Sequence, residues 1–273
     1  MSRIVVDGLH WEVRTHGAGV PLLLVHGFMG RGSTWGAHAT AFARRFRVVV
    51  VDLPGHGRSG IPSEPTRAGV ERTADDLAAI LSREVSAPAH VLGYSLGARV
   101  ALRLAITHPG VIRRLVLESP SAGIASEADR RARRAADDDR AARLERNGME
   151  AFVDEWEREP VLASLADLPP ARRAGLRAER LRNRPAGLAA SLRGAGQGSM
   201  EPLHDRLAAI RIPTLVIAGA LDPTGRSRAE TVAACIPGAR LEIVAGAGHT
   251  PHLESPATFR SLALAFLKED SAA

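Results

Sequence analysis

Six short apolar runs rich in β-branched residues recur along the chain, separated by segments with helical spacing. Strands that alternate with helices in this way form parallel sheets whose two faces are covered by the helices. Together with an antiparallel hairpin at residues 2–17, turning at Asp7-Gly8, they predict an α/β fold with a mostly parallel eight-stranded sheet. The runs lie at 20–27, 47–55, 89–95, 112–119, 213–219 and 239–246, and the helical segments lie near 34–45, 67–86, 95–108, 225–235 and 255–268.

The alternation stops between about residues 120 and 205. This stretch is rich in Arg, Ala, Asp and Glu, has helical spacing and contains no run that predicts a strand. We interpret it as a helical cap inserted after the sixth strand, with residues 1–119 and 206–273 forming the core and 120–205 the cap. The charge run DRRARRAADDDR at 129–140 also fits a solvated helix face with no further role.

Composition limits the compartment and the class of partner. The 273 residues suffice for one large domain with an insertion, and no apolar run reaches the roughly 20 residues that cross a bilayer. The N-terminus lacks the features of a secretion signal, and the single cysteine, Cys235, cannot form an intramolecular disulfide. We therefore expect a cytoplasmic protein without a membrane partner, as a monomer or a small homo-oligomer.

The net charge is positive, but its pattern does not indicate nucleic acid. The formal charge is +6, almost all basic residues are arginine, and Tyr94 is the only tyrosine. No nucleic-acid motif or interleaved aromatic series accompanies the arginines. An acidic small molecule fits better, although genome composition explains the number of arginines equally well.

A serine lies between two glycines in the pentapeptide GYSLG, residues 93–97. It matches the G-x-S-x-G pattern, in which a strand turns sharply into a helix and the serine takes a strained conformation. Gly93 and Gly97 suit this turn because it leaves no room for their side chains. The pentapeptide alone is a weak signal. The strand before it and the helix after it make Ser95 a candidate catalytic residue rather than an incidental serine in a turn.

A serine hydroxyl reacts only when an imidazole accepts its proton and a carboxylate orients that imidazole. Asp222 follows the run at 213–219, and His249 follows the run at 239–246. Both stand beyond the carboxyl ends of predicted strands, in the order Ser, Asp, His. His252 is a weaker alternative to His249 because it lies further into the loop or at the start of the last helix.

Two loops complete the pattern. In HGFMG, residues 26–30, we expect the Phe28 amide to join the Leu96 amide as an oxyanion hole beside the Ser95 hydroxyl. His26 then holds this loop rather than transferring protons. Asp52 begins the second loop, DLPGHGRS, and is expected to be structural as well.

These motifs, in this order, resemble the α/β-hydrolase superfamily over nearly the whole chain. That fold hosts esterases, lipases, C–C hydrolases, thioesterases and lyases on one triad. The cap narrows the choice, because SLRGAGQG, LVLESPSAGI and FVDEWEREPVLASL resemble one branch, the 2-succinyl-6-hydroxy-2,4-cyclohexadiene-1-carboxylate synthases of menaquinone biosynthesis. The chain departs from that branch at Ala98, where a glycine is common, and in AGQGS, where a sequence similar to MGTGA is usual.

The resemblance implies a lyase, without cofactor or metal, that eliminates pyruvate from 2-succinyl-5-enolpyruvyl-6-hydroxy-3-cyclohexene-1-carboxylate. It implies that Ser95 takes a proton with the help of His249, and that the oxyanion hole stabilises the resulting enolate. It further implies substrate-binding residues in the elbow and the cap, which are Tyr94, Arg99, Arg133, Trp156 and Arg180. Guanidinium groups bind carboxylates with two parallel hydrogen bonds, which a lysine cannot reproduce.

Several alternatives remain at this point. A shift of helical register would replace Arg133 by Arg134, and Arg180 by Arg177 or Arg184. Trp156 is also compatible with plain core packing, and Tyr94 with a place behind the pocket wall. A serine hydrolase, either a carboxylesterase or a C–C bond hydrolase acting through an acyl-enzyme, is the main functional alternative, and a ligand receptor is a third. Several arginines converging over Ser95 would favour an anionic substrate, whereas a simple esterase pocket is mainly apolar.

Overall fold

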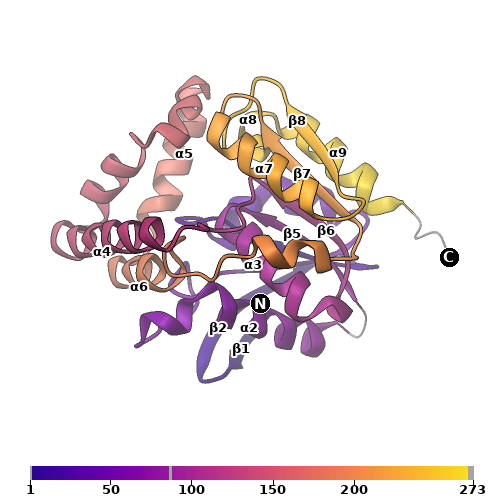
Figure 1. The fold of residues 1–273 in the computed structure, drawn as a ribbon, viewed down its shortest axis with the longest axis horizontal. Coiled ribbons are helices and arrows are strands. Elements are labelled where there is room, and N and C mark those ends of the chain that lie inside the picture. Colours follow the sequence, from indigo (N-terminus) through magenta and orange to yellow (C-terminus); the bar gives the residue numbers. More distant parts are fainter. Residues whose placement is uncertain (1, 86–87, 270–273) are drawn as a thin grey trace.

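The computed structural model describes residues 2–85 and 88–269, and these form one sheet with a helical insertion (Figure 1). The sheet has eight strands in the order β1-β2-β4-β3-β5-β6-β7-β8. Strands β3 to β8 pair in parallel, whereas β1 pairs with β2 and β2 with β4 in antiparallel fashion. The predicted sheet and hairpin are thus confirmed. The strands are β1 (Ser2–Val6), β2 (Leu9–His16), β3 (Pro21–Val25), β4 (Arg47–Val51), β5 (Ala89–Tyr94), β6 (Ile112–Glu118), β7 (Thr214–Gly219) and β8 (Arg240–Val244).

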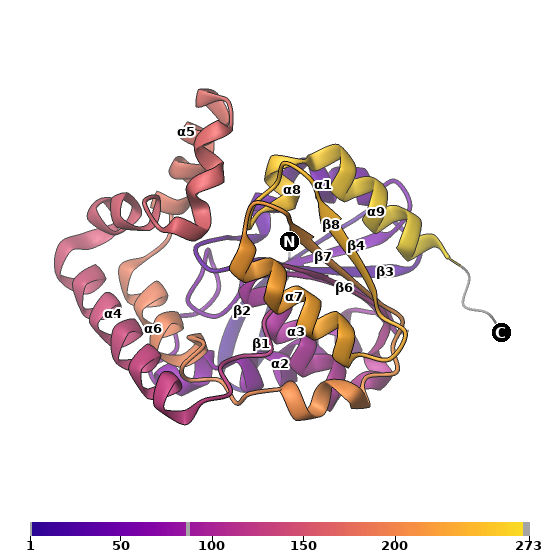
Figure 2. The same cartoon turned by 45° about the horizontal axis from the view of Figure 1, so that its top comes forward.

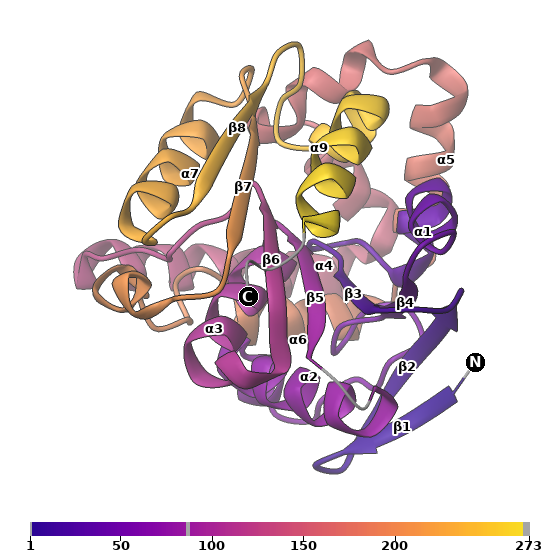
Figure 3. The same cartoon turned by 90° about the vertical axis from the view of Figure 1, so that its right-hand side faces the viewer.

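Helices cover both faces of the sheet (Figure 3). Helices α2 (Val70–Glu84), α3 (Leu96–Thr107) and α7 (Pro223–Cys235) pack on one face, and α1 (Gly36–Phe42) and α9 (Pro256–Lys268) pack on the other. Strands such as β3 are buried along their whole length, which explains why they are apolar at every position rather than at alternate ones. Residue 86 of the expected 67–86 helix lies outside the described residues.

The cap lies between β6 and β7 and, within the described residues, contains no strand. It consists of α4 (Glu127–Trp156), the 3₁₀ segment η4 (Pro160–Asp167), α5 (Pro170–Leu181) and α6 (Pro185–Ala195). Figure 2 shows α5 projecting beyond α4 and α6. Insertion after the sixth strand is confirmed, while the domain boundaries at 119/120 and 205/206 stay a prediction. Residues 1 and 270–273 of the predicted core lie outside the described part of the chain.

The cap meets the core through backbone contacts. A Cβ atom on Gly187 of α6 would lie 2.0 Å from the carbonyl oxygen of Gly55, and a Cβ on Gly55 would lie 2.2 Å from that of Gly187. The Asn183 side chain reinforces the contact, because its amide nitrogen donates to the Met29 carbonyl and its oxygen accepts from the Gly57 amide. The α6 end of the cap is therefore seated directly on the core loops.

None of the described helices is both long and apolar enough to span a membrane.

The short helix α8 (Pro251–Glu254) follows β8 and precedes α9, and it places the residues after His249 beside the carboxyl ends of the strands.

Candidate active site

The sharp turn at Ser95 is enforced by packing. Ser95 follows β5 directly and has a φ of 51°, in a region that residues with a side chain rarely occupy. A Cβ on Gly93 would lie 2.4 Å from the Gly97 carbonyl oxygen, and one on Gly97 would lie 2.2 Å from that of Val25. The neighbouring strand and helix thus leave room only for glycine on either side of the serine.

We expect Gly97→Ala to destabilise the protein strongly, because the new methyl group meets backbone atoms of β3 that cannot move aside. Such overpacking typically costs about 1–3 kcal/mol or more. The matched control is Gly175→Ala in α5, where no atom lies within 4 Å of the new Cβ. That change should stabilise the helix by about 0.5–1 kcal/mol. Urea unfolding of both variants measures the difference, and an unaltered midpoint for Gly97→Ala would contradict the packing account.

The three residues of the predicted triad lie within hydrogen-bonding distance. The Ser95 hydroxyl is 3.1 Å from His249 Nε2, and His249 Nδ1 is 2.8 Å from Asp222 Oδ2. A neutral imidazole with its hydrogen on Nδ1 satisfies both contacts, since Nδ1–H donates to the carboxylate and Nε2 accepts from the hydroxyl. In this tautomer His249 can take the proton of Ser95.

Asp222 is kept ionised by its hydrogen bonds. Burial by itself raises its pKa, but hydrogen bonds from His249 and from the Gly225 amide outweigh this effect and lower the pKa below the ordinary value. Asp222 also caps the N-terminus of α7. The carboxylate is therefore fixed in position and remains negative at neutral pH.

His252, the alternative histidine, pairs with a different carboxylate. Its Nδ1 is 2.9 Å from Oε1 of the fully buried Glu118, and its backbone amide donates to the same oxygen. Glu118 ends β6, the strand beside the elbow strand β5. The Glu118 carbonyl accepts from the Ser95 amide, but among the described residues the side chains of this second carboxylate–imidazole pair have no hydrogen bond to the Ser95 hydroxyl.

The amides of Phe28 and Leu96 are available at the elbow. Leu96 is the first residue of α3, so its N–H points out of the helix end without an intrahelical acceptor. The Phe28 amide donates to no acceptor among the described residues. Both residues line the cavity that contains the Ser95 hydroxyl. Their role as an oxyanion hole remains our proposal.

His26 and Asp52 hold the two loops in place, in line with the structural roles expected for them. The Leu53 amide donates to His26 Nε2, and His26 Nδ1–H donates to the Gly27 carbonyl oxygen. Burial lowers the pKa of His26, so it stays neutral. Asp52 accepts from the Gly32 and Arg58 amides.

A cavity of about 260 Å³ opens beside the triad between core and cap, and we call it the arginine cavity. Its lining includes Ser95 and His249 together with four arginines, namely Arg99, Arg133, Arg140 and Arg228. Arg99 is buried, and its guanidinium donates to the Ala195 carbonyl at 2.7 Å. Burial, aided by the positive charge of Arg133, lowers the pKa of Arg99 to about 10, which leaves it charged at neutral pH.

The cap contributes Arg133 and Arg140 to this cavity from one face of α4. Arg133 Nε lies 3.0 Å from both carboxylate oxygens of Asp137, and Arg140 pairs with Glu159. The predicted Arg133 therefore lines the cavity, whereas Arg134 bonds to the Gly198 carbonyl and lies outside the described lining. Sequence reasoning missed Arg140, although its spacing of seven residues from Arg133 places both on the same helix face.

A smaller cavity of about 110 Å³ also borders Ser95, and we call it the apolar cavity. Tyr94, Trp156 and Arg180 line it, and Trp156 borders the arginine cavity as well. Burial, followed by the negative charge of Glu118, raises the pKa of Tyr94, so its hydroxyl stays protonated. Tyr94 and Trp156 thus lie at the site, as the sequence predicts.

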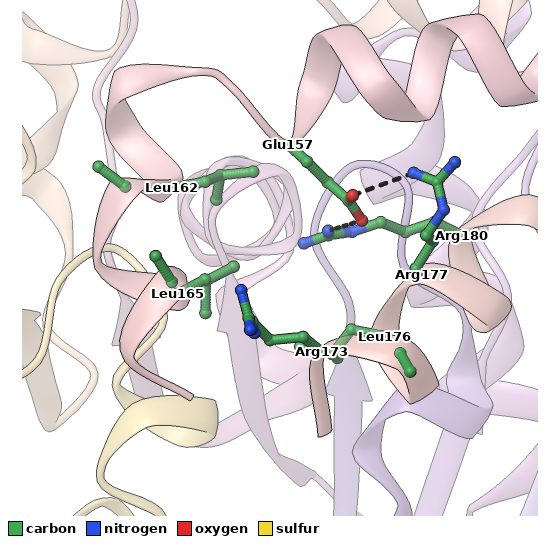
Figure 4. A pocket seen from close by; sticks show the side chains of 10 residues that line it. Glu157, Leu162, Leu165, Arg173, Leu176, Arg177 and Arg180 are labelled. Atoms are coloured by element: carbon green, nitrogen blue, oxygen red, sulfur yellow. Dashed lines mark hydrogen bonds and ion pairs between the residues drawn. The ribbon is translucent and has the colours of Figure 1, made fainter. Parts of the chain in front are cut away.

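Arg180 also borders an outer cavity of about 240 Å³, formed by η4 and α5 (Figure 4). Figure 4 shows Glu157 between Arg180 and Arg177, and its carboxylate oxygens lie 2.9 Å and 3.0 Å from these two guanidinium groups. Leu162 and Leu176 line both this cavity and the apolar cavity. Arg180 therefore lies where the two cavities meet and is absent from the described lining of the arginine cavity. Arg184 instead bonds to the Ser59 carbonyl in the core.

A serine on a strand-to-helix elbow, hydrogen-bonded to a histidine and an aspartate that follow later strands of the same sheet, defines a triad enzyme of the α/β-hydrolase type. The chain belongs to the alpha/beta hydrolase family, whose model matches residues 22–262, and within it to the 2-succinyl-6-hydroxy-2,4-cyclohexadiene-1-carboxylate synthases.

Relatives and solved structures support this family. A candidate synthase of that name from Bacillus subtilis is 35% identical, and the match covers 96% of each chain. The synthase of Klebsiella pneumoniae is 34% identical over 86% of this chain and 89% of its own. The structure of MenH from S. aureus is 34% identical with a TM-score of 0.90, covering 95% of this chain and 98% of that one.

Proposed function

We propose that this protein is a carbon–oxygen lyase of menaquinone biosynthesis. It eliminates pyruvate from 2-succinyl-5-enolpyruvyl-6-hydroxy-3-cyclohexene-1-carboxylate and forms 2-succinyl-6-hydroxy-2,4-cyclohexadiene-1-carboxylate. Beside the family relationship, one observation carries the proposal: four arginines and only two carboxylates line the described part of the cavity next to Ser95, where a simple esterase would have apolar walls. A substrate with several carboxylates matches that lining.

The reaction needs a base at one carbon and a stabilised negative charge on a nearby oxygen. The C2–H bond next to the succinyl ketone breaks, and its electrons form the enolate and then the C2–C3 double bond. The ring double bond moves to C4–C5 as the C5–O bond breaks. The enolpyruvyl group leaves as an enolate and takes up a proton to become pyruvate.

The site residues match these steps. Ser95 passes its proton to His249, which Asp222 orients. It then acts as the base at C2 without becoming acylated. The Phe28 and Leu96 amides donate to the enolate oxygen as its charge grows. Arg99 and Arg133 hold substrate carboxylates on one side of Ser95, and Arg180 does so at the apolar cavity. Tyr94 and Trp156 confine the ring.

The direct test supplies the enolpyruvyl substrate and follows pyruvate with a coupled assay, in parallel with a p-nitrophenyl ester. We expect pyruvate release under steady-state conditions and no burst with the ester. An ester burst without any pyruvate release would support the serine hydrolase instead, because only that mechanism passes through an acyl-enzyme.

Replacing Arg99 with Ala should lower kcat/KM for pyruvate release by about ten- to hundred-fold, the value of one charge-assisted contact of about 1.5–3 kcal/mol. Arg103 is a matched control, since it lies one turn further along α3, pairs with the exposed Glu201 and is absent from the described cavity lining. Arg103→Ala should leave kcat/KM unchanged. Equal kinetics for Arg99→Ala and wild type would exclude Arg99 from the carboxylate site.

The proposed function also leads to an expected compartment, partner class and oligomeric state. We propose a cytoplasmic enzyme that acts on a small anionic substrate, needs no cofactor or metal, has no nucleic-acid or membrane partner, and occurs as a monomer or small homo-oligomer. The single, exposed Cys235 is compatible with a reducing compartment.

A further inference from the structure

Arg228 enters the arginine cavity from the side opposite the cap. It lies on α7, the helix that begins at the triad residue Asp222, and it lines the cavity together with Gly225. The cap arginines, Arg133 and Arg140, reach the same cavity from α4. Arginines thus line the cavity on both its core wall and its cap wall, and the cap wall also carries the carboxylates of Asp137 and Glu159.

Arg228 differs from these arginines in its partners. Arg133 is bound by Asp137 and Arg140 by Glu159. Among the hydrogen bonds and ion pairs of residues 2–85 and 88–269, none involves the Arg228 guanidinium. All of its N–H donors are therefore available to a ligand, and its charge is not cancelled by a paired carboxylate.

The electrostatics of the cavity favour an anion at this position. Arg228 as a residue is exposed to solvent, but the packing around its guanidinium lowers its pKa first, and the positive charge of Arg133 lowers it further, so the two charges oppose each other. The nearby Asp222 raises this pKa, but its carboxylate is already bound by His249 and the Gly225 amide. A carboxylate between Arg228 and Arg133 would relieve the repulsion and use the unpaired donors.

We propose that Arg228 binds a carboxylate of the substrate, opposite Arg133, so that one anionic group bridges the core helix α7 and the cap helix α4. The identity of the substrate rests on the proposed function, whereas anion binding at Arg228 does not. Arg228 is then a specificity-determining residue, because it selects molecules that carry an acid group at the seam between the two parts of the fold.

The test compares Arg228→Ala with Arg226→Ala. Arg226 lies on the same helix, pairs with Glu230 at 2.8 Å and is absent from the described cavity lining, so it is a matched control. For Arg228→Ala we expect KM for the enolpyruvyl substrate to rise about ten- to hundred-fold with kcat and its pH profile largely retained. Arg228→Lys should recover part of the loss, and Arg226→Ala should match wild type.

A binding measurement separates this inference from the proposed reaction. The probe is 2-succinylbenzoate, a stable dicarboxylate that the proposed product would form by losing water. We expect calorimetric titration to give a Kd for Arg228→Ala that is about ten- to hundred-fold weaker than for wild type. If wild type binds the probe but releases no pyruvate, the proposed function fails and the role of Arg228 stands. Wild-type KM and Kd in Arg228→Ala, a change in kcat and pH profile alone, or no binding of the probe to wild type would each overturn the inference.

Discussion

Ser95→Ala is expected to lower kcat for pyruvate release by about 10²- to 10⁴-fold, the range that one positioned general base supplies. The arginines and the Phe28 and Leu96 amides that we propose as the oxyanion hole remain in this variant, so KM should change little. Stopped assays with the enolpyruvyl substrate measure both constants. The control is Ser82→Ala on α2, whose hydroxyl, within the described part of the chain, donates to the Ala78 carbonyl of its own helix alone. It should behave as wild type.

The same serine also separates the two chemistries that this fold supports. If Ser95 acts as a base, mass spectrometry of the protein during turnover should find the unmodified mass. If it acts as a nucleophile, the mass of an acyl group should be added to Ser95. A covalent adduct with the enolpyruvyl substrate, or full activity of Ser95→Ala, would contradict the mechanism proposed here.

Asp222→Asn should reduce kcat by up to about 10⁴-fold, because the amide no longer favours the imidazole tautomer that presents Nε2 to Ser95. The folded structure should persist, since asparagine also caps helices well.

The Asp222→Asn change should also alter how the stability of the protein depends on acid pH. A lowered carboxyl pKa contributes stability above its unfolded value and loses it as pH falls through the folded pKa. The variant lacks this contribution, which thermal unfolding at acidic and neutral pH would measure.

Glu118→Gln is the matched comparison, because Glu118 also orients an imidazole, that of His252. We expect kcat to stay near wild type while the free energy of unfolding falls by about 1–3 kcal/mol, the cost of disturbing a buried polar contact. A loss of kcat as large as that of Asp222→Asn would instead make His252 part of the catalytic machinery.

Local patterns carried much of the prediction. The strands, the hairpin and the elbow follow from short-range signals, such as continuous apolar runs bounded by turn residues and glycines around a serine. Ser95, Asp222 and His249 could be assigned because each directly follows a strand, and parallel strands bring their carboxyl ends to one edge of the sheet. The structure brings these three side chains together.

The positions of the cap residues relative to the site depend on long-range contacts, which local sequence patterns do not reveal. The contact between Arg180 and Glu157 joins residues 23 positions apart, and it places Arg180 at the outer cavity rather than with Arg99 and Arg133. Arg228 was missed because it lies on a helix whose exposed arginines resemble an ordinary solvated surface. Only the position of the cap helix α4 across the cavity from α7 turns that surface into a cavity wall.

The contact between Gly55 and Gly187 limits how this cap can be exchanged between enzymes. Each glycine leaves no room for a side chain on the other. Neither segment can therefore pack against a homologous segment that has a larger residue at this position. A chimera that receives this cap must also receive the loop containing Gly55, or its new lid will be held away from the sheet. The transferable unit for protein engineering is therefore the insertion together with its seat, two segments far apart in sequence that must be moved as one.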